Sequence, residues 1–226
     1  MCIRDRYWDW STAGKLDANG KPVVETRNGR PVYDGMKGDF VWEKNVTPDY
    51  YWYNGRMTYL TLESEIDPSR PVRINQVTGS ASDPDSRIFP FKIHRGKQPY
   101  DSQANRFVVP HLFGTDEAAY WKSFDWAKAI EAGQGYAGLP YSGEFGFVET
   151  EYLFETTHMV APKENALSCT ECHSRNGRLQ NIEGVYLPGR DRNHTADTLG
   201  WAAIMGTTLG VIGHGSFRYI RRKSTR

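Results

Sequence analysis

The sequence predicts a mainly α-helical protein with extensive irregular chain and one C-terminal transmembrane helix. Residues 116–132 have the periodicity of an amphipathic helix, because their large apolar side chains recur on one face. Residues 199–217 lack Asp, Glu, Lys and Arg and are long enough to cross a bilayer. Much of the remaining chain carries Gly, Pro, Asn and Asp in the combinations typical of turns, which indicates irregular structure.

The composition excludes one broad class of function. The chain has 226 residues, of which 38% are apolar and 13% aromatic, so something other than aliphatic side chains is expected to supply part of the core. Its 28 Lys and Arg residues are balanced by 27 Asp and Glu residues. Because the chain has no overall positive field, we do not expect nucleic-acid binding.

The N-terminal segment predicts one hairpin. Residues 1–6, which include Cys2, do not continue smoothly into the chain from Tyr7 onward and resemble a non-native junction, so we leave them out of the predicted fold. The polar segment 7–47 contains residues 22–26 and 30–33, which can pair as two short strands around a turn.

Residues 48–113 are expected to be largely irregular. Aromatic side chains gather in residues 48–62 around an Asn54-Gly55 turn, and such a cluster is more often plain core than a cofactor wall. Residues 65–113 offer only short extended pieces, at 72–74 and 106–109.

The clearest helix is expected at residues 116–132. Thr115 or Asp116 can cap its N-terminus, and Gly133 can end it. Its packing face is expected to consist of Tyr120, Phe124, Ala127 and Ile130. A further apolar segment at 145–160 precedes a short helix that Asn165 can cap.

Residues 197–220 are expected to form the transmembrane helix. At helical rise the uncharged part spans about 28 Å, close to the thickness of the hydrocarbon layer. The basic tail at 221–226 would then be cytoplasmic by the positive-inside rule, which places residues 7–196 on the periplasmic side of a bacterial inner membrane. A buried, glycine-rich core helix is the alternative.

Cys169, Cys172 and His173 form a Cys-x-x-Cys-His motif on the predicted short helix. In this motif the two cysteines form thioethers with haem vinyl groups, and the histidine is an axial ligand of the iron. We therefore predict one covalently attached haem c in this chain. A thioredoxin-like redox pair would need a βαβ setting, and a structural zinc site would need a second pair of ligands.

Haem c is attached outside the bacterial cytoplasm, yet no apolar signal-peptide segment lies near Met1. The sequence is therefore expected to be the C-terminal fragment of a longer, exported protein.

A second axial ligand is expected if the haem is low-spin. His158, His111 and His94 are candidate distal haem ligands, and the alternative for each is an ordinary polar residue. Met159 would instead give His/Met ligation. His214, inside the predicted transmembrane helix, is a candidate ligand of a b-type haem or a quinone-site residue, or a residue at the membrane interface.

Four runs of sequence carry a resemblance to a known family. They are HMVAPKENALSCTECHSRNGRL at 158–179, MKGDFVWEKN at 36–45, YYWYNG at 50–55 and RGKQPY at 95–100. Over roughly residues 30–180 the chain resembles the octahaem tetrathionate reductase family of multihaem c-type cytochromes. The resemblance implies an exported enzyme that reduces tetrathionate, and often nitrite or hydroxylamine, with mostly bis-His haems and one lysine-ligated active-site haem.

The resemblance also assigns individual residues. It implies that Cys169, Cys172 and His173 belong to the family's final haem, and that His158 and His111 ligate haems from the distal side. The lysine-ligated haem would lie outside this chain, so the resemblance does not imply that the fragment is itself catalytic. The transmembrane helix departs from the family and resembles an anchor, or the first helix of a fused cytochrome b.

The sequence therefore predicts electron transfer through haem c, as the C-terminal part of a membrane-anchored octahaem reductase of sulfur or nitrogen oxyanions. Residues 7–196 would be the C-terminal part of a multihaem cytochrome c domain. Its partners would be the membrane, other haems or redox subunits, and a cytochrome b that carries haem b and exchanges electrons with quinone. The alternatives are a membrane-anchored monohaem carrier without catalytic activity and a structural domain without haem.

Overall fold

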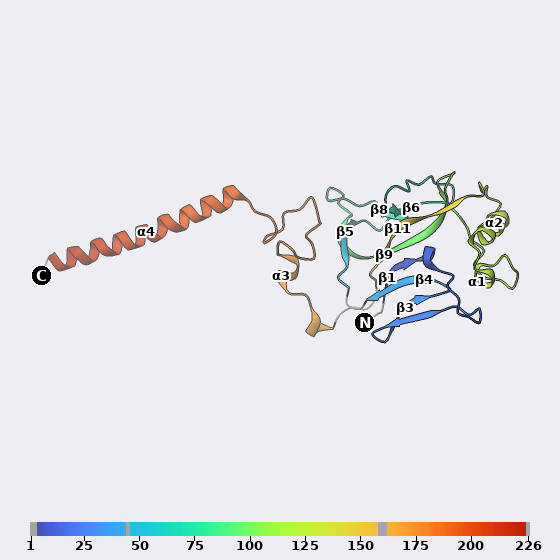
Figure 1. The fold of residues 1–226 in the computed structure, drawn as a ribbon. Helices are drawn as coiled ribbons and strands as arrows, with labels where there is room; N and C mark the ends of the chain where they lie inside the picture. Colours follow the sequence, from blue (N-terminus) through green and yellow to red (C-terminus); the bar gives the residue numbers. More distant parts are fainter. Residues whose placement is uncertain (1–3, 44–45, 158–161, 225–226) are drawn as a thin grey trace. The chain divides into compact units, whose positions relative to one another are not determined.

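The computed structural model describes residues 4–43, 46–157 and 162–224 and divides the chain into two compact units. The first unit comprises Met1–Ala166 with Asn181–Gly184, and the second comprises Leu167–Gln180 with Val185–Arg226. Figure 1 shows strands throughout the first unit, whereas the second contains α3 and the long helix α4.

The described elements of the first unit are mostly strands. The strands are β1 (Arg4–Asp9), β2 (Val24–Arg27), β3 (Arg30–Asp34), β4 (Gly38–Glu43), β5 (Asp49–Tyr53), β6 (Met57–Tyr59), β7 (Val72–Arg73), β8 (Asn75–Val77), β9 (Arg87–Asp101), β10 (Arg106–Phe107) and β11 (Phe145–Glu155). The helices are α1 (Tyr120–Ser123) and α2 (Trp126–Ala137), with 3-10 turns at Trp10–Thr12 and Lys163–Asn165. The helices of the second unit are α3 (Cys169–Cys172) and α4 (His194–Ser224).

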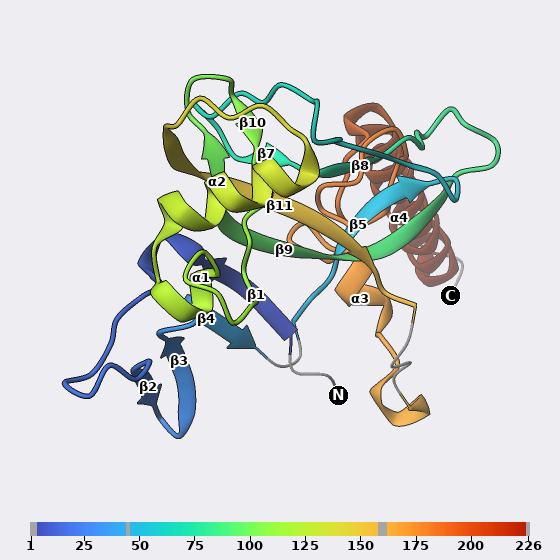
Figure 2. The same ribbon diagram turned by 90° about the vertical axis from the view of Figure 1, so that its right-hand side faces the viewer.

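Strand β9 is the centre of a mixed sheet. Within the described residues nine strands form this sheet, in the order β2-β3-β4-β1-β9-β11-β7, and β5 and β10 also pair with β9. β9 and β11 run antiparallel side by side from Phe91 opposite Glu155 to Asp101 opposite Phe145 (Figure 2). β1 pairs with β9 in parallel, and β6 pairs with β8 in a separate sheet.

The sheet shows that the predicted fold class, mainly α with extensive irregular chain, was wrong. Pro90, Gly96 and Pro99 make residues 87–101 look like a loop, because proline lacks the N–H that a central strand needs. Each proline, however, lies where β9 has a single partner strand: β5 at Pro90, and β11 at Pro99. The proline nitrogen, which carries no hydrogen, can therefore lie on the side of β9 where no strand pairs with that residue.

The hairpin predicted at residues 22–33 is confirmed. β2 and β3 pair antiparallel across Asn28 and Gly29, which have φ values of 51° and 71°. Positive φ at both central residues is the requirement of a type I′ turn, and Asn-Gly satisfies it at low cost. β1 begins at Arg4, within the junction-like residues 1–6, and pairs with β4 through its backbone.

The helix predicted at 116–132 is broken in two. Phe124 takes a left-handed conformation with φ 54°, and the Asp125 side chain then accepts a bond of 3.2 Å from the Lys128 N–H to begin α2. The predicted packing residues Tyr120 and Ile130 are fully buried. Ala127 is exposed, because the break rotates the second helix relative to the periodicity of one continuous helix.

The transmembrane prediction was wrong. Residues 197–220 lie in α4, but no helix in the described ranges is long and apolar enough to cross a membrane. The glycines of α4, together with Thr207, Thr208 and His214, make the segment uncharged without making it strongly apolar. The single-pass anchor on the periplasmic side of the inner membrane, and its cytoplasmic tail at 221–226, are therefore withdrawn.

Asp101 ties the end of β9 to the loop before β11. Only 2% of this residue is exposed, and its carboxylate accepts hydrogen bonds from the N–H groups of Gln103, Ala104 and Ser142, at 2.8 to 3.0 Å, and from the Ser142 hydroxyl at 2.7 Å. Burial alone would raise the pKa of Asp101, but the hydrogen bonds outweigh burial and lower the pKa. The ionised form is therefore the one that stabilises the fold.

We predict that Asp101→Asn lowers the free energy of unfolding at neutral pH by about 2 kcal/mol, because an amide cannot accept all four bonds. A lowered folded-state pKa stabilises above the unfolded pKa of about 3.9, and this stabilisation is lost as the pH falls through the folded pKa. The difference from the unsubstituted chain should therefore narrow in acid.

The measurement is denaturant unfolding followed by circular dichroism, at neutral pH and below the folded pKa. Asp85→Asn, at an exposed position, is the matched control. Equal destabilisation by Asp101→Asn at both pH values would contradict the prediction.

Candidate functional site

The cysteine motif lies on the single-turn helix α3, which local hydrogen bonds hold in place. The Ser168 N–H donates to the Glu171 carboxylate at 3.0 Å, and the Arg178 guanidinium donates to the same carboxylate at 3.0 Å. The Ser168 N–H and then Arg178 lower the pKa of Glu171, so the carboxylate stays ionised. Gly177 is required beside this pair, because a Cβ there would lie 2.8 Å from the Glu171 carbonyl oxygen. Asn165, predicted to cap this helix, lies instead in the preceding 3-10 turn.

α3 brings Cys169, Cys172 and His173 together. Cys169 is exposed, Cys172 is half-buried, and both thiols are free. The His173 N–H donates to the Cys169 carbonyl oxygen at 2.8 Å, which closes the turn and fixes the histidine backbone beside the two cysteines. The thiols are therefore one helical turn apart and accessible.

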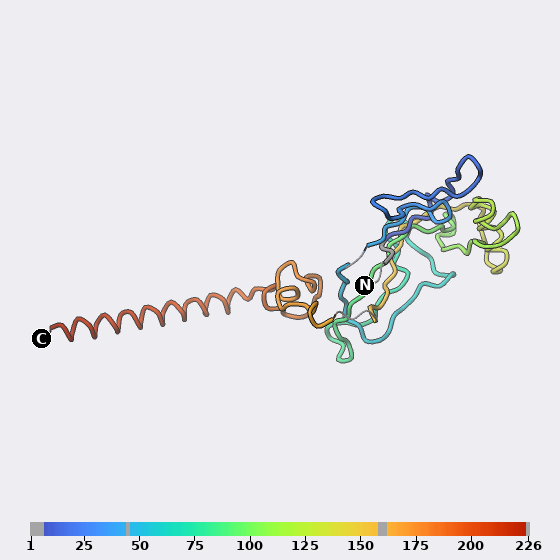
Figure 3. Tube along the Cα trace, turned by 90° about the horizontal axis from the view of Figure 1, so that it is seen from below, coloured from blue at the N-terminus to red at the C-terminus, as the bar shows by residue number. Residues whose placement is uncertain are grey.

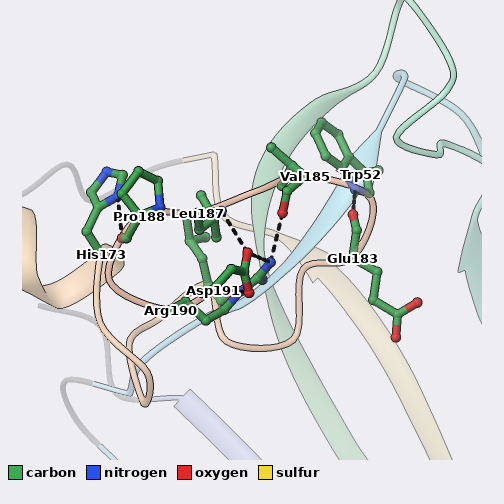
Figure 4. Close-up of polar contacts among 9 residues, drawn as sticks. Trp52, His173, Glu183, Val185, Leu187, Pro188, Arg190 and Asp191 are labelled. Atoms are coloured by element: carbon green, nitrogen blue, oxygen red, sulfur yellow. Dashed lines mark hydrogen bonds and ion pairs between the residues drawn. The ribbon is translucent and has the colours of Figure 1, made fainter. Parts of the chain in front are cut away.

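The imidazole of His173 has a defined hydrogen-bond partner. Its Nδ1 lies 3.3 Å from the carbonyl oxygen of Pro188, and both residues are labelled in Figure 4. A carbonyl oxygen can only accept, so Nδ1 is the donor in this contact and Nε2 is the ring nitrogen left to bind a metal. This is the tautomer in which histidine ligands commonly bind metals, with the second ring nitrogen held by a backbone carbonyl.

The loop that carries Pro188 is held by an ion pair. Arg190 donates through Nε and Nη2 to both carboxylate oxygens of Asp191, each at 2.7 Å (Figure 4). The same guanidinium donates to the carbonyl oxygens of Leu179 and Val185, at 2.9 and 2.8 Å. Asp191 also accepts from the Leu187 N–H at 2.7 Å. Figure 3 follows this coiled segment into α4.

These residues fit a haem c better than the two alternatives. Two accessible thiols one turn apart, followed by a histidine whose Nδ1 is held by a backbone carbonyl, match the demands of thioether formation and iron ligation. Among the described residues, no group of three or more His, Cys, Asp and Glu side chains supplies the further ligands that a structural zinc site needs. The second unit has no named strand in its described part, so a thioredoxin-like βαβ setting is not present there.

The other candidate histidines have separate environments. His94 lies on β9 opposite Tyr152, with its ring 6.5 Å from that of Phe154. His111 precedes α1, and its Nε2 lies 3.0 Å from the Asp116 carboxylate, whose pKa this contact lowers. His214 is exposed on α4, and its proposed role rested on the transmembrane helix. His158 and Met159 lie outside the described residues.

Sequence reasoning missed Pro188, Arg190 and Asp191. They come after the motif at a distance without periodicity, so nothing in the sequence connects them to His173. The one available signal was Pro188-Gly189, a dipeptide typical of turns.

The comparisons with known proteins agree on one class. The family described as "Cytochrome c bacterial" matches residues 6–176. Among solved structures, the octahaem cytochrome c from Shewanella oneidensis is similar, with a TM-score of 0.68 and 36% identity. The match covers 81% of this chain and 43% of that one, so the chain spans less than half the length of the octahaem protein. A search of curated proteins found no match.

Proposed function

The chain belongs to the bacterial cytochrome c family, and from this premise we propose that Cys169, Cys172 and His173 form its haem-attachment site. The family and the octahaem relative bear out the coarser prediction, a multihaem-type c-type cytochrome that transfers electrons through covalently bound haem c. The observation that supports the site is the geometry of α3, with two accessible thiols one turn apart and Nε2 of the next residue ready to bind iron.

Each residue has one role in this proposal. The Cys169 and Cys172 thiols would each add across a haem vinyl group, which would consume the double bond and need no oxidant. His173 would hold the iron through Nε2, while its Nδ1–H donates to the Pro188 carbonyl oxygen. When bound, the haem supplies one-electron exchange between ferrous and ferric iron.

We predict that Cys169→Ser and Cys172→Ser each leave a single thioether, and that the double variant holds no haem covalently. The full chain is exported into a periplasm with haem-attachment machinery, denatured and extracted with acidified acetone. Retained haem is measured by mass and by the absorption of its pyridine complex. Cys2→Ser is the control and should retain haem fully. Full retention by the double variant would exclude the site.

The finer proposal is that this chain is the C-terminal part of an octahaem reductase resembling tetrathionate reductase, which acts on sulfur or nitrogen oxyanions. Support comes from the four family-like runs, of which three lie within the first unit, and from 36% identity to an octahaem protein. The chain holds one Cys-x-x-Cys-His motif, so reduction would occur on haems carried by other parts of the protein. The second candidate is a monohaem carrier that catalyses nothing.

The test of this proposal is reduction of tetrathionate by the native protein, with a dye as electron donor and nitrite and hydroxylamine as further substrates. An octahaem reductase should oxidise the reduced dye only when a substrate is added, and it should contain several haems per polypeptide. His173→Ala should reduce the rate at least tenfold if electrons enter or leave through this haem. A native protein with one haem and no substrate-dependent dye oxidation would support the monohaem carrier.

We further propose that His111, His158 and His94 are distal ligands of haems in the intact protein. For His111 the structure adds a condition: Asp116 holds Nε2, so the histidine can bind iron through Nδ1 or after Asp116 releases it. The His111 N–H donates to the Ala129 carbonyl oxygen at 2.8 Å, and the His111 carbonyl oxygen accepts from the Tyr120 N–H at 2.9 Å. These bonds fix the backbone, so only rotation of the side chain can bring the imidazole to an iron.

For His111→Ala we expect one low-spin haem of the intact protein to become high-spin, because a bis-His iron would lose one ligand. Electron paramagnetic resonance of the oxidised protein measures this conversion. His194→Ala, at an exposed position at the start of α4, is the control. An unchanged low-spin signal would remove His111 from the ligand set.

A further inference from the structure

We infer that the Arg190–Asp191 ion pair is a positioning device for the haem ligand, because it fixes the carbonyl that hydrogen-bonds His173 and thereby lowers the reduction potential of the haem. The inference rests on the proposed attachment site and adds two residues that hydrogen-bond to each other and to the segment around the turn. Arg190 and Asp191 act on His173 through the turn that contains Pro188.

The turn has the arrangement of type II. The Arg190 N–H donates to the Leu187 carbonyl oxygen at 3.1 Å, so Leu187 and Arg190 are its first and fourth residues. Pro188 occupies the second position and Gly189 the third, with φ of 87°. Type II requires positive φ at the third position, and proline is favoured at the second. The peptide between Pro188 and Gly189 is thereby oriented, and its carbonyl oxygen is the one that meets His173.

Gly189 is required by both conformation and space. A Cβ at this position would lie 2.3 Å from the His173 carbonyl oxygen and 2.9 Å from its carbonyl carbon. A side chain would therefore strain the turn and push it away from the histidine backbone. The contact between the turn and His173 depends on a glycine in the left-handed region.

The ion pair secures the turn from both ends. Asp191 accepts from the Leu187 N–H, at the start of the turn, while Arg190, at its end, reaches back to the Leu179 and Val185 carbonyl oxygens. The Arg190 side chain is 13% exposed, so these charge-assisted bonds are largely shielded from water. A lysine could not make this set, because it lacks the planar fork of donors.

The hydrogen bond to Pro188 has an electronic consequence. Donation from Nδ1 increases the electron density of the imidazole and makes Nε2 a stronger donor to iron. A stronger donor stabilises ferric over ferrous iron, so the bond lowers the reduction potential. Weakening the turn should raise the potential while the thioethers, formed by α3, remain.

The experiment compares three substitutions in the full, haem-loaded chain. Gly189→Ala disfavours the positive φ that the turn requires. Asp191→Asn removes the negative charge of the ion pair, and Arg190→Lys removes the planar set of guanidinium donors. Each should raise the reduction potential, with a shift of about 59 mV corresponding to a tenfold change in the ratio of reduced to oxidised haem. Gly200→Ala, Asp197→Asn and Arg192→Lys are the matched controls, because these residues lie outside the turn and its hydrogen bonds.

Potentiometric titration measures the shift, and ¹⁵N-histidine spectra of the reduced protein report whether Nδ1 of His173 keeps its proton in a hydrogen bond. A higher potential with faster exchange of that proton, at unchanged covalent haem content, supports the inference. Potentials within the spread of the controls, with haem retained, overturn it and leave the attachment site standing. No covalent haem in the unsubstituted chain overturns both. The three substitutions weaken the turn by different routes, so loss of haem in one leaves the others to decide.

Discussion

The pairing of β9 is the constraint on which the first unit depends. β1, β5 and β11 come from distant parts of the chain and β10 follows β9 directly, and each of the four pairs with this one strand. The buried N–H and C=O groups of β9 need hydrogen-bond partners, and these strands supply most of them. A buried backbone group left without a partner would lower the stability of the fold by about 1–3 kcal/mol. Asp101, the last residue of β9, accepts from the backbone N–H groups of Gln103, just beyond β9, and of Ser142, in the loop before β11.

Local chemistry explains which parts of the fold could be predicted. The hairpin around Asn28-Gly29 depends on two adjacent residues that tolerate positive φ, so the sequence alone was sufficient. β9 could not be identified in this way, because its prolines oppose a strand and only partners far away in the sequence override them. The transmembrane error has a different origin: an absence of charge was taken for apolar character, although glycine and threonine contribute little to it.

The proposed haem site shows the same division between local and distant determinants. Cys169, Cys172 and His173 are contiguous enough to be predicted as a unit, since their chemistry is set by one helical turn. Pro188 lies far enough along the chain that no helical or strand periodicity connects it to His173. Its contribution is a backbone carbonyl, which any residue has, so the residue type indicates a turn but does not connect that turn to His173. Only the conformation of the turn places this carbonyl oxygen beside Nδ1 of His173.

In the proposed site this division would separate attachment of the haem from tuning of its iron. The thioethers would depend on α3, which Glu171, Arg178 and Gly177 stabilise. The strength of the bond to Nδ1 depends instead on the turn, which Arg190, Asp191 and Gly189 stabilise. The two sets share no residue, so under the proposed attachment site a change in the turn would act on the electron affinity of the iron through Nδ1 of His173, and the thioethers would remain on α3.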